Sequence, residues 1–288
     1  MLTVGSFRIQ SVVTGTFRLD GGAMFGVVPK ALWSNKMEAD ELNRIPLAAR
    51  ALLAVDRESH RIVVVDTGCG TKWDAKEAER FAIRHNPDAI VDSLRSIGRT
   101  AADVTDVVVT HLHFDHNGGL SVWAEGPGGD TRLCFPRASH WIHRRQWDHA
   151  HSPSAKDRAS YLPIDFAALE RSETLRFVEG DEPEPPFPGM EWLLSHGHTP
   201  YQLHPIFRVG TEKLVFTGDI VPTLAHLRTT WVMAYDLFPL TTISEKETLF
   251  RRGIEEGLRL AFPHDPEVGG VAIAGTVDRP IVTRTLEL

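Results

Sequence analysis

Short apolar runs separated by turn residues occur throughout the first part of the chain. The alternating run Leu2–Val13 and the β-rich runs Arg50–Val55 and Arg61–Val65 predict strands, and Asp56–His60 between the last two is typical of a hairpin turn. The apolar run Asp106–Thr110 predicts a further strand. Because strands with two buried faces carry near-continuous apolar residues, Arg61–Val65 and Asp106–Thr110 are expected in the interior of a sheet.

Apolar residues at helical spacing predict helices between and after these strands. One helix is expected over Pro87–Ile97, where Gly98 follows as a residue suited to end it. Further helices are expected over Ser139–Trp147 and in parts of Ser154–Arg171. The most regular helical pattern covers Ser244–Leu260, with its first residue as the expected N-cap.

The second half of the chain also contains strand-length runs, which are Thr131–Phe135, Met190–Leu194, Leu203–Val209, Lys213–Thr217, Val271–Ala274 and Ile281–Thr285. The proline-rich segment Gly180–Gly189 is typical of an extended surface loop and not of a domain linker. Strands grouped in each half, with helices between and after them, predict a layered α/β sandwich. We expect a single domain over residues 1–288.

Composition and charge narrow the class of protein. Of the 288 residues, 42% are hydrophobic and 24% are charged, which is typical of a soluble globular chain. The formal net charge of −7 argues against a nucleic-acid partner, which usually requires a basic patch. No secretory signal is evident, and no apolar run approaches the roughly 18 residues of a membrane span. We therefore expect a cytoplasmic protein without a membrane partner, and Cys69 and Cys134, which cannot form a disulfide framework, fit a reducing compartment.

Three histidines and one aspartate fall within six residues directly after the predicted strand Asp106–Thr110, at His111, His113, Asp115 and His116. Imidazole and carboxylate groups at this density suit divalent metal ions such as zinc. Side chains two positions apart on an extended backbone point the same way, so His111 and His113 can share one metal ion. Asp115 and His116 then turn into the next element and can serve a second. The alternative, a polar loop with solvated histidines, is much less favoured for four such residues after a strand.

Four residues cannot complete two metal sites, so further donors are required from elsewhere in the chain. His198 and Asp219 each follow a predicted strand, and His264 lies just past the long predicted helix. Each of these residues alone is typical of a solvated or capping side chain, and the first cluster is what makes the set significant. His196, two residues before His198, is an alternative for the same position.

The string His111–His116, followed by His198, Asp219 and His264, resembles the motif of the metallo-β-lactamase superfamily, and the motif order begins at Asp66. The resemblance implies a four-layer αββα sandwich with a metal site at one edge of the sheets. It also implies two divalent ions, with zinc as first choice and manganese, iron or cobalt as alternatives. By position, the ligands of the first ion would be His111, His113 and His198, those of the second Asp115, His116 and His264, and the bridge Asp219. Asp66 would support a ligand from behind.

Three other segments resemble a bacterial branch of that superfamily, the quorum-quenching lactonases. They are Leu19–Lys30 with the following Trp33, Pro222–His226 and Trp231–Asp236. The resemblance implies a small-molecule substrate, a lactone or related ester with N-acyl-homoserine lactones as first candidate. A metal-bridging hydroxide would attack its carbonyl. Asp115 is expected to pass a proton to the leaving group.

Apolar residues of these segments are candidates for the wall of an acyl pocket, and they are Met24, Phe25, Trp33, Trp231 and Met233. The alternative for Met24–Pro29 is a core strand and turn, and the alternative for Trp231–Tyr235 is packing against the sheet. In the better-known acyl-homoserine lactonases a tyrosine lies three residues after the bridging aspartate, where this chain has Pro222. His226 and Tyr235 are the candidates to replace that tyrosine as the group that contacts the substrate carbonyl.

Other functions stay open on the sequence alone. The same ligands would serve hydrolysis of a phosphotriester, a thioester or an aryl ester, and the chain could also be a metal-binding scaffold without turnover. A nucleophilic Cys69 is less favoured than a structural thiol, because free cysteine is among the most buried residues. The region before Arg50 could cover the site or pair with a second subunit, so a homodimer is also open.

Overall fold

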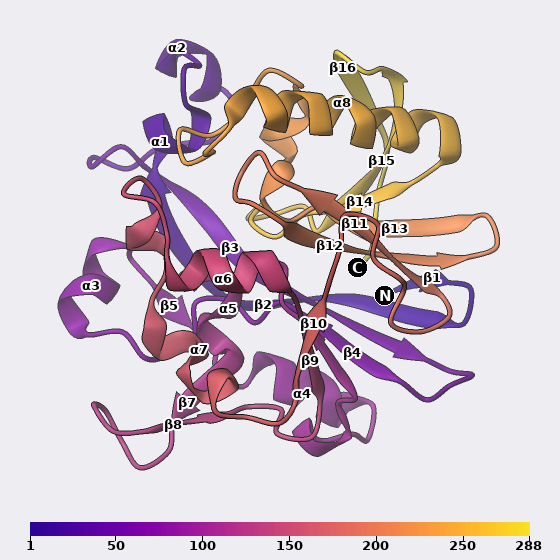
Figure 1. Cartoon of the computed structure of the whole chain (residues 1–288). Helices are drawn as coiled ribbons and strands as arrows, with labels where there is room; N and C mark the ends of the chain where they lie inside the picture. The colour runs from indigo at the N-terminus through magenta and orange to yellow at the C-terminus, as the bar shows by residue number, and fades with distance from the viewer.

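Two β-sheets pack face to face, with helices on both outer sides (Figure 1). The computed structural model describes all residues 1–288. The first sheet has the strand order β1-β2-β3-β4-β6-β9-β10, with β5 paired to β2. Its strands are β1 (Leu2–Val4), β2 (Phe7–Asp20), β3 (Arg44–Asp56), β4 (Ile62–Val65), β5 (Arg84–His85), β6 (Asp106–Val108), β9 (Ser139–His143) and β10 (Leu175–Val178).

The second sheet follows chain order from β11 to β16. Its strands are β11 (Met190–Ser195), β12 (Gln202–Val209), β13 (Glu212–Phe216), β14 (Arg259–Ala261), β15 (Gly270–Thr276) and β16 (Arg279–Thr285). A small separate sheet pairs β7 (Ser121–Trp123) with β8 (Thr131–Leu133). The helices are α1 (Gly21–Phe25), α2 (Lys30–Trp33), α3 (Ala75–Arg80), α4 (Ala89–Ser96), α5 (Phe114–Asn117), α6 (Arg144–His151), α7 (Pro163–Glu170) and α8 (Pro239–Glu256).

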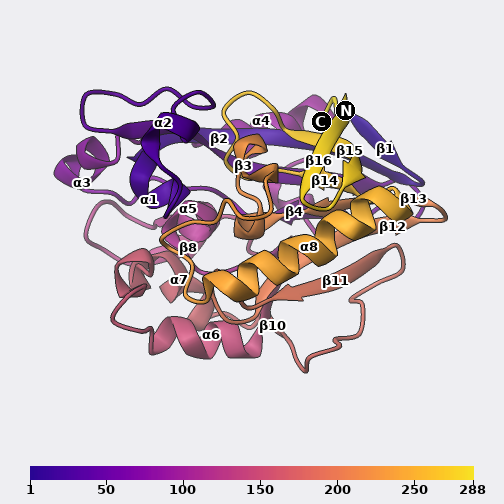
Figure 2. The same cartoon turned by 90° about the horizontal axis from the view of Figure 1, so that it is seen from above.

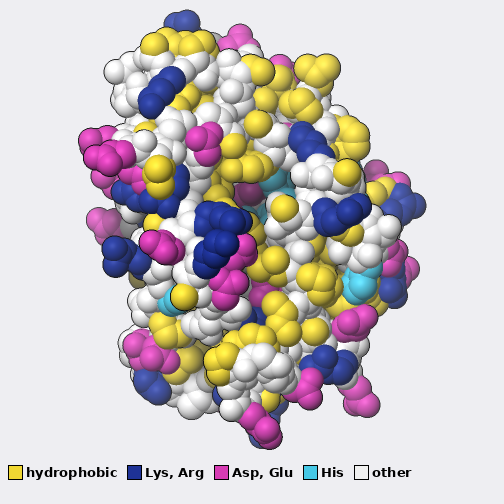
Figure 3. Space-filling model, turned by 90° about the vertical axis from the view of Figure 1, so that its left-hand side faces the viewer, with side chains coloured by type: hydrophobic (Ala, Val, Ile, Leu, Met, Phe, Trp, Pro, Cys, Tyr) yellow, Lys and Arg dark blue, Asp and Glu magenta, His cyan; other side chains and the backbone are white.

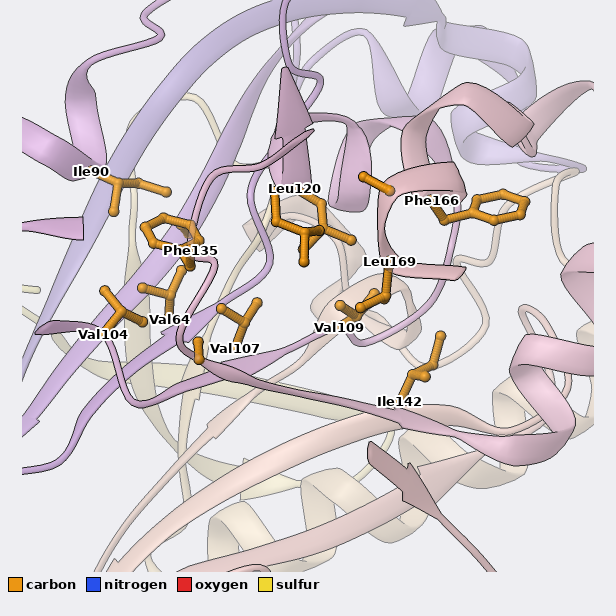
Figure 4. Close-up of a cluster of buried hydrophobic side chains, with 14 of the residues drawn as sticks. Val64, Ile90, Val104, Val107, Val109, Leu120, Phe135, Ile142, Phe166 and Leu169 are labelled. Carbon is orange, nitrogen blue, oxygen red and sulfur yellow. The ribbon is translucent and has the colours of Figure 1, made fainter. Parts of the chain in front are cut away.

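Buried hydrophobic clusters define four layers. One cluster lies between the two sheets and includes Phe7 and Phe207, whose rings meet edge to face at 5.3 Å. A second fills the space between the first sheet and α4, α6 and α7 (Figure 4). A third lies between the second sheet and α8, which runs across the outer face of that sheet (Figure 2). The layers confirm the predicted αββα sandwich.

The strand β4 shows why the central strands carry uninterrupted apolar residues. Val63 and Val65 belong to the cluster between the sheets, whereas Ile62 and Val64 belong to the cluster beneath the helices. Successive side chains of a strand point to opposite faces, so a strand buried on both faces must be apolar at every position. The prediction of a buried strand here is confirmed.

Two predicted helices have the wrong limits or the wrong structure. Ser139–Trp147 begins as the strand β9, in which His140 pairs with Val107 of β6, and helix α6 starts only at Arg144. The predicted helix Ser244–Leu260 instead begins five residues earlier, at Pro239, whose fixed φ suits the first turn. Ser244 therefore lies inside the helix and is not its N-cap.

Further differences concern lengths and ends. The helix α8 ends at Gly257 in the left-handed conformation (φ 68°), so the last residues of the predicted helix form β14 instead. The strands β2 and β3 extend well beyond their predicted ranges and pair from Phe7↔Asp56 to Asp20↔Arg44. Between them lies helix α1, which the apolar pattern did not predict. Asp20 caps α1 by accepting a hydrogen bond from Ala23 N at 2.8 Å.

The other predicted elements correspond closely to observed ones. The helix predicted over Pro87–Ile97 is α4, and the segment Ser154–Arg171 is helical in part, as the 3₁₀ turn Arg158–Ser160 and α7. The proline-rich segment Gly180–Gly189 contains no helix or strand. No helix of the chain combines the length and the apolar character needed to cross a membrane.

His140 provides a test of how burial in this fold affects stability. Burial lowers the pKa of its imidazole to about 4, from 6.5. Between these values the unfolded chain binds more protons than the folded chain, so the free energy of unfolding falls as the pH is lowered from 6.5 towards 4. At pH 5 the loss caused by His140 is about 2 kcal/mol.

We expect His140→Asn to remove that part of the pH dependence, measured by urea unfolding of the metal-free protein at pH 7 and pH 5. His60→Asn, in an exposed turn, serves as the control and should keep the pH dependence of the wild type. An unchanged pH dependence in His140→Asn would contradict the expectation.

Candidate metal centre

Seven side chains with metal-ligating atoms meet at one edge of the two sheets. The first sheet supplies residues after β6 and on α5, and the second sheet supplies residues after β11, β13 and β14. These residues are His111, His113, Asp115, His116, His198, Asp219 and His264, and all are buried. Figure 3 views the molecule from this side and shows histidine at the floor of a hollow surrounded by hydrophobic side chains.

Asp66 ties the two central strands of the first sheet together at this edge. The strands β4 and β6 are parallel, with Val65 opposite Val108, so both end here. Asp66 accepts hydrogen bonds from Thr110 N, Thr110 Oγ1 and His116 Nδ1, each at 2.8 Å. Its backbone adopts φ 54°, a conformation that is uncommon for residues with a side chain. Asp66 thus lies behind a candidate ligand, where the resemblance placed it.

The first group brings three imidazole nitrogens together. His111 Nε2 and His198 Nε2 each lie 3.1 Å from His113 Nδ1. This group could hold one metal ion. His196, the alternative to His198, lies outside the group: its Nδ1 accepts a hydrogen bond from Tyr201 N at 3.2 Å, and its ring packs against that tyrosine.

The second group combines two imidazoles with two carboxylates. His264 Nε2 lies 3.0 Å from His116 Nε2 and 3.4 Å from Asp115 Oδ2. Asp219 Oδ1 lies 3.1 Å from His116 Nε2 and 3.2 Å from His264 Nε2. The other oxygen of Asp219, Oδ2, lies 3.3 Å from His198 Nε2 in the first group. Asp219 therefore contacts both groups through different oxygens, which is the arrangement a bridging carboxylate needs.

Hydrogen bonds on the outer side of the rings fix which nitrogen faces inward. His264 Nδ1 lies 2.9 Å from the carbonyl oxygen of Ala48, which can only accept, so Nδ1 carries the hydrogen and Nε2 presents a lone pair. His116 and His198 donate from Nδ1 to carboxylates at 2.8 and 3.0 Å. His111 Nδ1 bonds the Thr110 hydroxyl at 3.0 Å.

Inward lone pairs require a cation between them. His116 Nε2 and His264 Nε2 lie 3.0 Å apart beside the carboxylate of Asp219, so either a proton or a metal ion must separate them. Burial opposes a charge on His116, but Asp219 and Asp115 raise its pKa well above its usual value, so protons and metal compete for this place. Histidine and carboxylate donors in this arrangement fit zinc, manganese, iron or cobalt.

His111 and His113 are held in the neutral form that binds metal. Burial lowers the pKa of both imidazoles well below the usual value, and neighbouring histidines lower it further. His113 differs from the other four histidines of the two ligand groups because its outer nitrogen, Nε2, has no hydrogen-bond partner. Its ring packs instead against Tyr161, with the centroids 4.6 Å apart.

Asp236 is a residue of the centre that sequence reasoning missed. Its Oδ1 accepts the hydrogen bond from His198 Nδ1 at 3.0 Å, and its Oδ2 accepts one from Met233 N at 3.2 Å. A histidine that binds metal usually needs a hydrogen-bond acceptor for its outer nitrogen, so an acidic residue such as Asp236, at the end of the segment Trp231–Asp236, could have been considered for this role. No spacing rule connects positions 198 and 236, so the pairing required the structure.

A cavity of about 140 Å³ opens over the candidate ligands. Its remaining wall is mostly apolar, and no lysine or arginine lines it. The hydrophobic residues of the lining are Leu19, Met24, Leu47, Phe81, Phe114, Ala159, Met233 and Tyr235. Five of these, Leu19, Leu47, Phe81, Phe114 and Ala159, were not anticipated from the sequence.

The five predicted wall residues divide into two sets. Met24 and Met233 line the cavity. Phe25, Trp33 and Trp231 do not: Phe25 stacks on Trp33 at 5.3 Å and meets Trp231 edge to face at 5.6 Å. The structure therefore does not bring these three aromatic residues to this cavity, because they pack with one another in a hydrophobic cluster.

Of the two candidates to contact a substrate carbonyl, only Tyr235 lines the cavity. Burial raises the pKa of its phenol to about 12, and Asp20 and Asp115 contribute, so the hydroxyl keeps its proton. His226 is directed elsewhere, because its Nδ1 bonds the Thr223 hydroxyl at 2.7 Å and its Nε2 bonds the carbonyl oxygen of Met24 at 2.8 Å.

Cys69 lies close to the centre but is a poor nucleophile. Burial raises the pKa of its thiol well above the usual value, and the nearby Asp115 raises it further. Since the thiolate is the reactive form, the structure agrees with a structural thiol.

Known proteins resemble this chain in sequence. The family model described as Metallo-beta-lactamase superfamily matches residues 52–266. The N-acyl homoserine lactonase AttM of Azorhizobium caulinodans is 25% identical over 192 residues, which cover 65% of this chain and 68% of that protein. AttM of Rhizobium radiobacter is 26% identical over 132 residues, which cover 46% of this chain and 38% of that protein. The matched region thus spans only part of these relatives.

Solved structures share the fold over nearly the whole chain. A probable metal-dependent hydrolase from Staphylococcus aureus has a TM-score of 0.85 and 29% identity, and the match covers 99% of this chain and 100% of that one. AidC, a dizinc quorum-quenching lactonase, has a TM-score of 0.78 and 20% identity, covering 99% of this chain and 97% of that one. At 20% identity this second likeness shows the fold alone.

Substitutions in the two groups of candidate ligands are expected to remove different amounts of metal. We expect His264→Ala to lower bound zinc from two ions per chain to one, because it removes a ligand of the second group only. Asp219→Ala should lower zinc below one ion per chain, because Asp219 contacts both groups. Zinc is measured by plasma mass spectrometry after dialysis, with His196→Ala as the control that keeps two ions. Retention of two ions by Asp219→Ala would contradict the bridging position.

Proposed function

Because the chain belongs to the metallo-β-lactamase superfamily and is a metal-dependent hydrolase, we propose that it opens the ring of lactones at a dinuclear centre. N-acyl-homoserine lactones are the first candidates, since two of the relatives are N-acyl homoserine lactonases. The observation that carries the proposal is an apolar cavity without lysine or arginine placed directly over the candidate ligands. The relatives that are N-acyl homoserine lactonases, which match part of this chain, support lactones as the substrate class.

The chain's own residues would divide the chemistry as follows. Two divalent ions, zinc first among them, would supply a Lewis acid and an activated water at neutral pH. The first ion would be held by His111, His113 and His198 and the second by Asp115, His116 and His264, with Asp219 between them. Asp115 also lines the cavity, so its carboxylate is placed to carry a proton to the leaving alkoxide. The protonated Tyr235 would donate a hydrogen bond to the substrate carbonyl.

The lining also favours uncharged substrates. Away from the candidate ligands, the wall has no lysine or arginine that could pair with a carboxylate or phosphate on the arm of the substrate. Burying an unpaired charge is costly, so a neutral acyl arm is favoured over an anionic one. Met24, Met233 and Phe81 would contact that arm. A cytoplasmic location and a homodimer stay predictions.

The decisive experiment measures ring opening of N-acyl-homoserine lactones of increasing acyl length by the zinc-loaded protein, with a chelator-treated control. We expect chelator-sensitive turnover, with kcat/KM rising up to about fourfold per methylene until the cavity is filled. Protein that carries two zinc ions but opens no lactone would contradict the proposal. Neutral phosphotriesters, thioesters and aryl esters would then be assayed, because the same ligands would serve them.

Removal of the Tyr235 hydroxyl tests its role. We expect Tyr235→Phe to lower kcat for lactone opening roughly 10–100-fold with little change in KM, because the lost hydrogen bond strengthens only as charge develops on the carbonyl oxygen. Its zinc content should stay at that of the wild type. Tyr201→Phe, which removes a hydroxyl that does not line the cavity, is the matched control, and equal kcat values in the two variants would assign Tyr235 to packing alone.

A further inference from the structure

The first half of α8 packs directly on the segment that carries His198. Leu237 N donates a hydrogen bond to His198 O at 3.1 Å, and Phe238 N donates one to Gly197 O at 2.8 Å. Gly197 lies so close to the helix that an added Cβ would be 2.3 Å from Thr242 N. The backbone next to His198 is therefore held by the start of α8 and by the two residues that precede this helix.

Glu245 of α8 holds the same segment by its backbone N–H groups. Its Oε1 accepts a hydrogen bond from His196 N at 2.6 Å, and its Oε2 accepts one from Gly197 N at 3.1 Å. Two consecutive N–H groups bound to one carboxylate fix the orientation of the peptide units Ser195–His196 and His196–Gly197, just before His198. Charged acceptors make such bonds stronger than neutral ones.

Lys246, the next residue of α8, holds a second segment by its carbonyl groups. Its side chain is fully buried, and its Nζ donates hydrogen bonds to Arg228 O at 2.9 Å and to Trp231 O at 2.6 Å. No salt bridge accompanies it, so two carbonyl oxygens accept the hydrogen bonds of a buried amine. The segment that it holds continues into Met233 and Asp236.

Asp236 closes the connection between the two segments. It accepts the hydrogen bond from His198 Nδ1 and, through its other oxygen, one from Met233 N. Consecutive residues of a helix point about 100° apart, so Glu245 and Lys246 can reach different segments from one turn. Glu245 thus fixes the backbone just before His198. Lys246, in the same turn of α8, fixes the segment that leads to Asp236, the acceptor of the His198 imidazole.

We propose that Glu245 and Lys246 are positioning residues of the metal centre, which hold His198 and Asp236 in the geometry that binds the first ion. The inference rests on the proposed dinuclear function. Neither residue lines the cavity or belongs to the ligand groups, so both act through the residues they hold.

The test compares zinc affinity, by competition with a chromophoric chelator, and the visible absorption spectrum of cobalt-loaded protein. In Glu245→Gln only one oxygen can still accept an N–H group, so we expect the site of the first ion to lose 10–100-fold in zinc affinity and the cobalt spectrum to change. Lys246→Met should cause a loss of similar size, and Lys246→Arg, which keeps donors, should recover part of it. Glu255→Gln, exposed on the same helix, is the control that changes neither readout.

The outcomes separate this inference from the proposed function. Zinc affinity within twofold of the wild type and an unaltered cobalt spectrum in both Glu245→Gln and Lys246→Met would overturn the positioning role, even if both variants melt at lower temperature. If Lys246→Met fails to fold, Glu245→Gln decides alone. A wild-type protein that binds fewer than two metal ions would instead overturn the proposed dinuclear function, and the inference with it.

Discussion

The hydrogen bond on the outer side of four of the five candidate imidazole ligands, all except His113, is the constraint that organises this structure. A ring held at Nδ1 can present only the lone pair of Nε2, so the position of the outer partner decides both tautomer and direction. For His264 that partner is the carbonyl oxygen of Ala48 on β3, although His264 follows β14 of the other sheet. The same segments are joined by Ala48 N to His264 O at 3.0 Å and by Arg50 N to Pro263 O at 3.1 Å. The contact between the sheets at this edge therefore also determines how the centre is assembled.

The aromatic residues behind the cavity show how a wall is kept rigid without facing a ligand. Phe25 lies between Trp33 and the ring of His226, which it stacks upon at 4.8 Å with nearly parallel planes. His226 in turn bonds the carbonyl oxygen of Met24, the residue that does line the cavity. Burial lowers the pKa of His226 to about 3, so its ring stays neutral and apolar enough for this core. The shape of the cavity thus depends on residues one layer removed from it.

The sequence allowed the candidate ligands to be predicted better than the cavity. His111 to His116 stand together after an apolar strand, so their donor types and spacing were visible directly. Phe25 and Met24 are adjacent and both apolar, and only the stacking of rings from distant segments decides which of them faces the cavity. The limits of α8 depended on Pro239 and Gly257, residues whose backbone preferences outweighed the apolar periodicity used to place the helix. Asp236 was missed because its partnership with His198 arises from packing and not from spacing.

The distribution of the candidate ligands along the chain has a consequence for stability in the cell. His111 and His264 are far apart in the sequence and follow strands of different sheets, so a chain whose sheets have separated presents no complete centre. Ions that bind only the docked arrangement stabilise it by mass action, by about 2.7 kcal/mol for one site at a free concentration one hundred times its dissociation constant. Metal supply would then govern how long the protein survives as well as whether it works. In cells short of the ion, the two sheets of the metal-free protein would separate more often, and the protein would be degraded by proteases faster.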